Sequence, residues 1–246
     1  DVYRQVREKA AELIRKMYVI FEEKVRPRLA ESRVLIKRTS DLDADQQKFV
    51  KRFFDSTLFP VVTPMAVDQG HPFPVLPSKT MAFAVHLARG DDLHLAVIPV
   101  PSGLSRLLKL PSIKDGHEFI LIEDVLRENL KGFFRGYEIR SHTLFRVIRD
   151  SELSVDEEFS PNLLQSIEEE IKKRPRARVV QLMIEEGCPE DLWAMLTEAI
   201  GFLKEETTIL GGALDLSFLF GLVAQAQEPS LLYPTLTSGK MEYENI

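Results

Sequence analysis

The segment TMAFAVHLARGDDLHLAVIPV, residues 80–100, decides the fold of this 246-residue chain. Two apolar runs flank RGDD, a pattern that predicts a β-hairpin. One register keeps every large side chain on a single face of that hairpin. Its cross-strand pairs are Leu87 with Leu93, Val85 with Leu95, and Phe83 with Val97. The same register predicts that His86 lies directly opposite His94 on the other face.

Further strands and helices are expected on the C-terminal side of the hairpin. Runs rich in β-branched and aromatic residues predict strands over residues 117–123, 137–150 and 178–185. Apolar positions at helical spacing predict helices over residues 124–131, 161–174 and 189–203. GGALDLSFLFGLVA, residues 211–224, closes the compact part. Because strands and helices mix without regular βαβ alternation, we expect an α+β head domain with a largely antiparallel sheet.

The first part of the chain is predicted to be helical. Apolar residues recur at three- and four-residue steps from Val6, and Pro27 should end or kink this helix near Val25 or Arg26. A second helix is expected to carry its apolar side chains at Phe49, Val50, Phe53 and Phe54. Its candidate N-caps are Ser40, Asp41 and Asp43. Two helices cannot bury both apolar stripes, so a helical partner is expected upstream of Asp1.

A proline-rich connector, FPVVTPMAVDQGHPFPVLPSK, separates the helical and strand-rich parts. We place a domain boundary within this connector. The predicted regions are the end of a helical domain over 1–64, the α+β head over 65–226, and a linker over 227–246. The chain begins without Met in a helical pattern and ends without a clear boundary, so we expect a piece of a longer protein.

Composition narrows the classes of function. With 44% hydrophobic and 28% charged residues, the chain is typical of a globular domain, and no apolar run is long enough for a transmembrane segment. The net charge of −6 disfavours a broad nucleic-acid-binding surface. A single cysteine, Cys188, excludes an intramolecular disulfide and fits the cytoplasm, and the acidic residues before it disfavour a reactive thiolate.

Metal and phosphate motifs are weak. The His86/His94 pair could be half of a zinc site, but a third ligand is missing, which favours two half-exposed imidazoles on a polar face. The sequence has neither GxxxxGK[ST] nor GxGxxG. Gly211 and Gly212 precede a short helix whose N-terminus could hold an anion, but Asp215 follows where that anion would lie. A turn with an acidic cap is the simpler interpretation.

The densest basic cluster is KKRPRAR, residues 172–178. A solvated helix end explains much of it. The other interpretation is contact with a polyanion, which makes Lys172, Lys173 and Arg174 candidate phosphate ligands. On that interpretation the chain could be a stand-alone anion-binding or interaction module.

Two arginines interrupt the apolar run LFRVIRD, residues 144–150. A guanidinium among apolar neighbours needs a carboxylate, a carbonyl or a phosphate as its partner. Arg146 and Arg149 are three residues apart, so on a regular strand they point to opposite faces unless a bulge intervenes. Either at least one forms an internal carboxylate pair, or Arg149 reaches into a cleft to bind a phosphate oxygen.

Three segments carry a family resemblance: RFFDSTLFPVVTPMAVDQGHPFPVLPSK, FRVIRDSELSVDEE and RARVVQLMIEEGCPEDL. Together they resemble the bacterial polyphosphate kinases that make long-chain polyphosphate through a phosphohistidine. The resemblance implies a cytoplasmic enzyme, able to associate with membranes, that reversibly transfers the terminal phosphate of ATP to polyphosphate with Mg²⁺, leaving ADP. It also implies a homo-oligomer formed through the head domain.

The resemblance places this chain at the end of the family's N-terminal domain, the whole head and the start of the next domain. The family's phosphohistidine, metal-linked arginines and nucleotide contacts have no matching position here, so no catalytic, cofactor or metal residue is assigned. His71, within the family-like GHPFP, precedes a proline and is better explained by turn geometry. We therefore expect the fragment alone to be inactive, with a role in architecture, dimerisation and the lining of the phosphate path.

Overall fold

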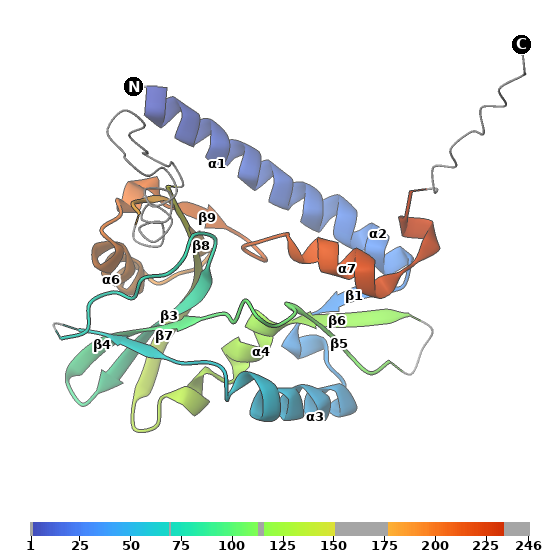
Figure 1. Cartoon of the computed structure of the whole chain (residues 1–246), viewed down its shortest axis with the longest axis horizontal. Helices are drawn as coiled ribbons and strands as arrows, with labels where there is room; N and C mark the ends of the chain where they lie inside the picture. The colour runs from blue at the N-terminus through green and yellow to red at the C-terminus, as the bar shows by residue number, and fades with distance from the viewer. Residues whose placement is uncertain (1, 69, 113–115, 151–176, 234–246) are drawn as a thin grey trace, which may run out of the picture.

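The computed structural model describes residues 2–68, 70–112, 116–150 and 177–233 as a mixed α+β fold with two sheets (Figure 1). The larger sheet has the strand order β2-β4-β3-β7-β8-β9. Its neighbours are antiparallel except for the parallel pair β8 and β9. The bounds are β2 Met65–Val67, β3 Met81–Arg89, β4 Asp92–Pro99, β7 Glu138–Arg149, β8 Val179–Glu185 and β9 Thr208–Leu210. The predicted fold class is confirmed.

A smaller sheet has the order β1-β6-β5, with β1 parallel and β5 antiparallel to the central strand. Its strands are β1 Val34–Lys37, β5 Leu107–Lys109 and β6 His117–Leu121. The strand predicted over 117–123 therefore exists, and it belongs to this second sheet. It ends early because α4 begins at Ile122.

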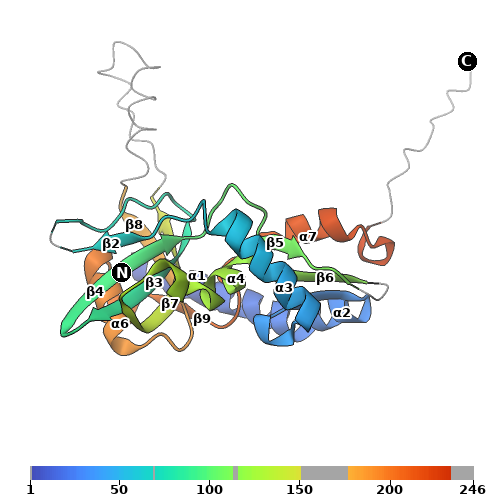
Figure 2. The same cartoon turned by 90° about the horizontal axis from the view of Figure 1, so that it is seen from below.

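The helices lie at the edges and faces of the two sheets. Their bounds are α1 Val2–Ile20, α2 Arg26–Glu31, α3 Ala44–Phe53, α4 Ile122–Glu128, α6 Glu190–Ile200 and α7 Phe218–Ala226. Figures 1 and 2 show α6 at the end with the large sheet, and α2 and α7 at the other end, beside the small sheet. The predicted helix over 161–174 lies outside the described residues. No described helix combines the length and apolar character needed to cross a bilayer.

The N-terminal helix changes type before Pro27. A π-helical turn, Phe21–Val25, joins α1 to α2, and the N–H of Arg26 donates to the carbonyl of Phe21. Pro27 therefore lies in the first turn of α2, where a missing N–H costs little. The outer side of α1 leaves Val6 and Leu13 exposed. The helical partner expected upstream of Asp1 stays a prediction.

The predicted register of the hairpin is wrong by one residue. His86 pairs with Leu95 and Leu87 with His94, so the two histidines point to opposite faces of the sheet. Gly90, at φ 62°, and Asp91 form a two-residue turn between Arg89 and Asp92. The predicted register would have left one residue in that turn, too few for a hairpin loop. Both faces of the sheet are buried here, so Leu95 and Val97 of β4 can lie on the face opposite to Phe83 and Val85 of β3.

Three hydrophobic clusters hold the elements together. The first packs Phe83 and Val85 of β3 against α3, α4 and Tyr18 of α1. The second packs the other face of the large sheet, including Phe145, against α6. The third joins the small sheet to the α1–α2 junction and α7. Burying one such phenylalanine contributes about 2–3 kcal/mol. The first cluster contains residues from both sides of position 64, and the domain boundary stays a prediction.

Candidate functional site

The first arginine of the run 144–150 has an internal carboxylate partner. Nη2 of Arg146 lies 3.3 Å from Oδ2 of Asp215, and its Nε donates to the carbonyl of Lys79 at 3.4 Å. Arg146 is on the face of β7 that bears Leu144 and Ile148, which belong to the first cluster. Arg146 therefore forms an internal carboxylate pair, which is one of the two interpretations drawn from the sequence.

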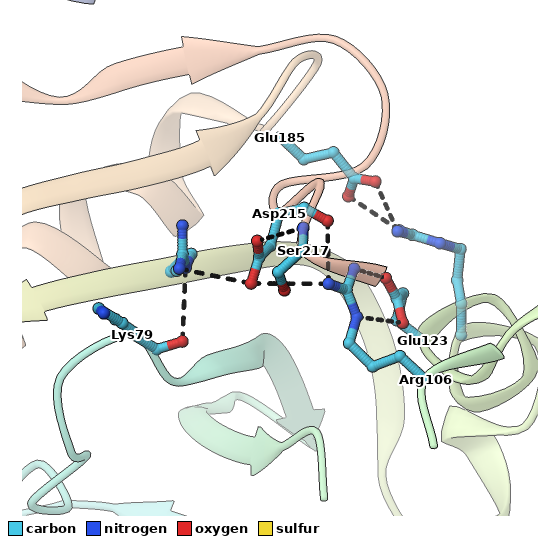
Figure 3. Close-up of polar contacts among 8 residues, drawn as sticks. Lys79, Arg106, Glu123, Glu185, Asp215 and Ser217 are labelled. Atoms are coloured by element: carbon cyan, nitrogen blue, oxygen red, sulfur yellow. Dashed lines mark hydrogen bonds and ion pairs between the residues drawn. The ribbon is translucent and has the colours of Figure 1, made fainter. Parts of the chain in front are cut away.

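A second guanidinium shares the same carboxylate. Nη1 of Arg106 lies 3.6 Å from Oδ2 of Asp215 and donates to the Asp215 carbonyl at 2.9 Å. Its other side binds both oxygens of Glu123, which is 2% exposed, at 2.5 and 3.4 Å. Figure 3 shows Arg106 between these two acids. Two cations and two carboxylates therefore balance one another in a network that we call the Asp215 network: Arg106, Glu123, Arg146 and Asp215.

Asp215 is oriented by the turn that precedes α7. Its carboxylate accepts the N–H of Ser217 at 2.9 Å, and Gly212 supplies a backbone at φ 89° that favours glycine. The expected acidic turn is thus present, and its carboxylate also neutralises two arginines. Burial, assisted by the Asp215 charge, raises the pKa of the neighbouring Tyr18 to about 12.

The second arginine of the run is held by backbone oxygens. Nε of Arg149 donates to the carbonyl of Leu76 at 2.7 Å, and Nη1 donates to the carbonyl of Ala177 at 2.6 Å. The N–H of Arg149 also donates to Oγ of Ser78 at 3.0 Å. Burial lowers the pKa of this guanidinium.

The bulge at this end of the sheet is in β8. The register shift between Ile148 and Arg149 leaves Val180 of β8 without a partner residue. Strand β7 itself therefore keeps its alternation, and Arg146 and Arg149 point to opposite faces, as predicted for a regular strand.

A cavity of about 450 Å³ adjoins the Asp215 network. Its walls are mostly proline and aliphatic side chains from the connector and from residues 99–104. Among the described residues, its charged lining consists of Lys79, Arg106 and Asp215. Since the last two pair with each other, Lys79 supplies the charge that this lining does not balance.

A larger cavity of about 670 Å³ lies beside α4 and the C-terminal end of β8. Here Arg127 binds both oxygens of Glu185, at 2.9 and 2.5 Å, and lies 5.1 Å from the centre of the Phe83 ring. Burial, followed by the Glu123 charge, raises the pKa of Asp124 to about 6. Burial, with the Arg127 charge, lowers the pKa of His142.

Among the described residues, the remaining candidates from the sequence do not gather at one place. His86 lies 3.1 Å from Asp191 across the sheet from His94, and His94 packs edge-on against Tyr137. Within the described ranges, no group of three or more His, Cys, Asp or Glu side chains is placed to hold a metal ion. Lys172, Lys173 and Arg174 lie outside the described residues.

Two further motif residues have structural explanations. His71 closes a turn with Asp68 through backbone bonds in both directions, at 2.9 and 3.1 Å, and the hydrogen bond from its ring lowers the pKa of the Asp68 carboxyl. Burial raises the pKa of Cys188, as expected for a thiol of low reactivity.

Sequence reasoning missed Arg106 and Glu123. Glu123 follows an apolar run. Its need for a buried partner becomes apparent only once strand β6 is known to lead directly into α4. Arg106 precedes β5, a strand of three residues that the sequence did not predict.

Sequence comparison relates this chain to a known protein family. A family model described as the polyphosphate kinase middle domain matches residues 45–222. Polyphosphate kinases from Exiguobacterium sp. and Bacillus anthracis are each 35% identical, over 88% and 93% of this chain. These alignments cover 30% and 34% of the two relatives, so the chain spans about a third of their length.

The fold also matches a solved structure. The crystal structure of a polyphosphate kinase from Porphyromonas gingivalis superposes with a TM-score of 0.73 over 96% of this chain and 34% of that one. The two sequences are 22% identical, so this likeness concerns the fold alone.

Proposed function

Because this chain belongs to the polyphosphate kinase family and contains its middle domain, we propose that it is part of an ATP:polyphosphate phosphotransferase. The parent enzyme would reversibly transfer the terminal phosphate of ATP to long-chain polyphosphate and leave ADP. The match of the family model over residues 45–222 is the observation that carries this proposal.

Within that enzyme, we assign this region a non-catalytic role as a rigid head domain. In-line phosphoryl transfer needs a nucleophile, a metal site and several converging cations. The Asp215 network instead uses its two arginines internally, and Arg149 is held by carbonyls. ATP and Mg²⁺ would be bound by other parts of the parent polypeptide. We place no step of the reaction on residues of the described chain.

The remaining expectations are proposals of the same kind. The head would contribute to a homo-oligomer, and the enzyme would act in the cytoplasm, with or without membrane association. Direct phosphate contact by Arg146 or Arg149 would require a phosphate to displace the partners that each already has, so a positioning role is the simpler proposal. Contacts by Lys172, Lys173 and Arg174 also stay predictions.

The test uses the complete enzyme and ATP labelled at its γ-phosphate. We expect label in long-chain polyphosphate with the complete enzyme and none with the 246-residue chain alone. We also expect no covalent label on the five histidines of this chain. Synthesis by the isolated chain, or phosphate found on one of those histidines, would overturn the non-catalytic assignment.

A further inference from the structure

We propose that Lys79 contacts the polyphosphate chain, and that Arg146 and Arg149 act as positioning residues that hold Lys79 in place. This proposal rests on the proposed function and adds a specific residue to it. Four observations carry it: the backbone conformation of Lys79, the clamps on both sides of it, its unbalanced charge and the adjoining cavity.

Lys79 has a φ of 69°, in the left-handed region that lysine rarely adopts. Such a conformation costs free energy and persists only where surrounding contacts enforce it. Here the N–H of Lys79 donates to the carbonyl of Val147 at 2.7 Å, and its carbonyl accepts from Arg146 at 3.4 Å. Both bonds come from β7 and fix the peptide groups on either side of the strained residue.

The residues just before Lys79 are held by Arg149. Its guanidinium binds the carbonyl of Leu76, and its N–H donates to the hydroxyl of Ser78. The segment 76–79 is therefore clamped at one end by Arg149 and at the other by Arg146. This arrangement explains why two arginines interrupt an otherwise apolar strand.

The side chain of Lys79 is exposed, and within the described part of the chain no carboxylate pairs with its ammonium group. It lines the cavity of about 450 Å³ together with Arg106, whose charge is balanced by Glu123 and Asp215. An exposed ammonium beside a balanced network leaves one positive charge available for an anion. Lysine binds phosphate oxygens as a mobile point charge.

The described cavity lining offers no place for the base of a nucleotide to stack. It contains no aromatic side chain. The contact we infer is therefore between the Lys79 ammonium and phosphate oxygens of polyphosphate.

The test measures KM for polyphosphate and for ADP in ATP synthesis by the complete enzyme. We expect Lys79→Gln to raise KM for polyphosphate by about three- to tenfold, as for the loss of one exposed charge-assisted contact, and to leave KM for ADP unchanged. Lys79→Arg should restore the affinity. Lys79→Gly should raise KM in the same way without lowering the melting temperature, because glycine accepts the left-handed backbone.

The matched control is Lys131→Gln, an exposed lysine outside this cavity lining. Equal KM values for polyphosphate in the Lys79→Gln and Lys131→Gln enzymes would overturn the proposal, as would an increase confined to KM for ADP. Direct binding of fluorescently labelled polyphosphate to the same proteins needs no catalysis. Binding that depends on Lys79 in an enzyme without kinase activity would refute the proposed function while supporting this contact.

Discussion

Asp215 and Arg146 meet at 3.3 Å between two segments far apart in the chain, and the same Asp215 oxygen lies 3.6 Å from Arg106. The side chains are only 15–17% exposed. The carboxylate therefore joins β7, the approach to β5 and the turn before α7. Its charge is the main compensation for Arg146, because the only other recorded partner of that guanidinium among the described residues is the Lys79 carbonyl.

Replacing this carboxylate should be costly. We expect Asp215→Asn to lower the free energy of unfolding by about 2–4 kcal/mol, since it leaves a largely buried cation without its counter-charge. Thermal and urea denaturation would measure the loss. Asp45→Asn is the matched control, because Asp45 pairs with Lys48 on the surface and should contribute less than about 1 kcal/mol. Equal losses in the two variants would contradict the role assigned to Asp215.

Local patterns predicted the elements of this fold better than the contacts between them. The long strand β7, strand β8 and helix α6 follow from apolar spacing. Helix α6 ends at Ile200, before the predicted residue 203, because Gly201 has a positive φ that closes the helix. The register of the hairpin was wrong because it was chosen from side-chain size, whereas the two-residue turn at Gly90 sets it.

The Asp215 network could be predicted only in part. The sequence shows that Arg146 needs a partner, because its neighbours are apolar and its charge is permanent. It does not show which carboxylate is that partner, because Asp215 reaches Arg146 through the packing of α7 and the small sheet. The positive φ of Lys79 could not be predicted from the sequence either, because lysine is not a residue type that favours this conformation.

The start of α3 offers a test of one prediction that the structure confirms. Asp43 accepts the N–H groups of Asp45 and Gln46 at 3.0 and 2.9 Å. We expect Asp43→Ala to lower the free energy of unfolding by about 1 kcal/mol. Ser40, another candidate cap, donates only to Asp41 among the recorded contacts, so Ser40→Ala should change stability by less than about 0.5 kcal/mol. A larger loss of stability with Ser40→Ala than with Asp43→Ala would show that Ser40 is the cap.

Arg149 should matter for stability as well as for activity. Arg149→Ala leaves the carbonyl of Leu76, a residue that is 2% exposed, without this donor, and we expect a loss of about 1–3 kcal/mol in the free energy of unfolding. KM for polyphosphate should rise in the same variant, because segment 76–79 loses one clamp. Arg140→Ala, which removes an exposed side chain 3.9 Å from Glu138, serves as the control for both measurements. Loss of activity with full thermal stability would instead indicate direct substrate contact by Arg149.

Asp124 predicts a pH dependence of stability. Burial raises its pKa to about 6, so the folded protein holds this proton more tightly than the unfolded chain, whose aspartates titrate near about 4. Between these two values the unfolded chain ionises first, and rising pH therefore lowers the stability that this residue contributes. Above about pH 6 Asp124 is ionised in both states, and its burial then lowers the free energy of unfolding by the full amount, on the order of 2–3 kcal/mol.

The Asp124→Asn variant removes this cost. We expect it to melt at a higher temperature than the wild type near about pH 7.5 and at nearly the same temperature near about pH 2.5, where both states of the wild type are mostly protonated at this position. Asp68→Asn should show the opposite trend, because the hydrogen bond from His71 lowers the pKa of Asp68 and its contribution to stability is lost as pH falls. A difference in melting temperature between Asp124→Asn and wild type that stays constant with pH would show that Asp124 acts through packing and not through its charge.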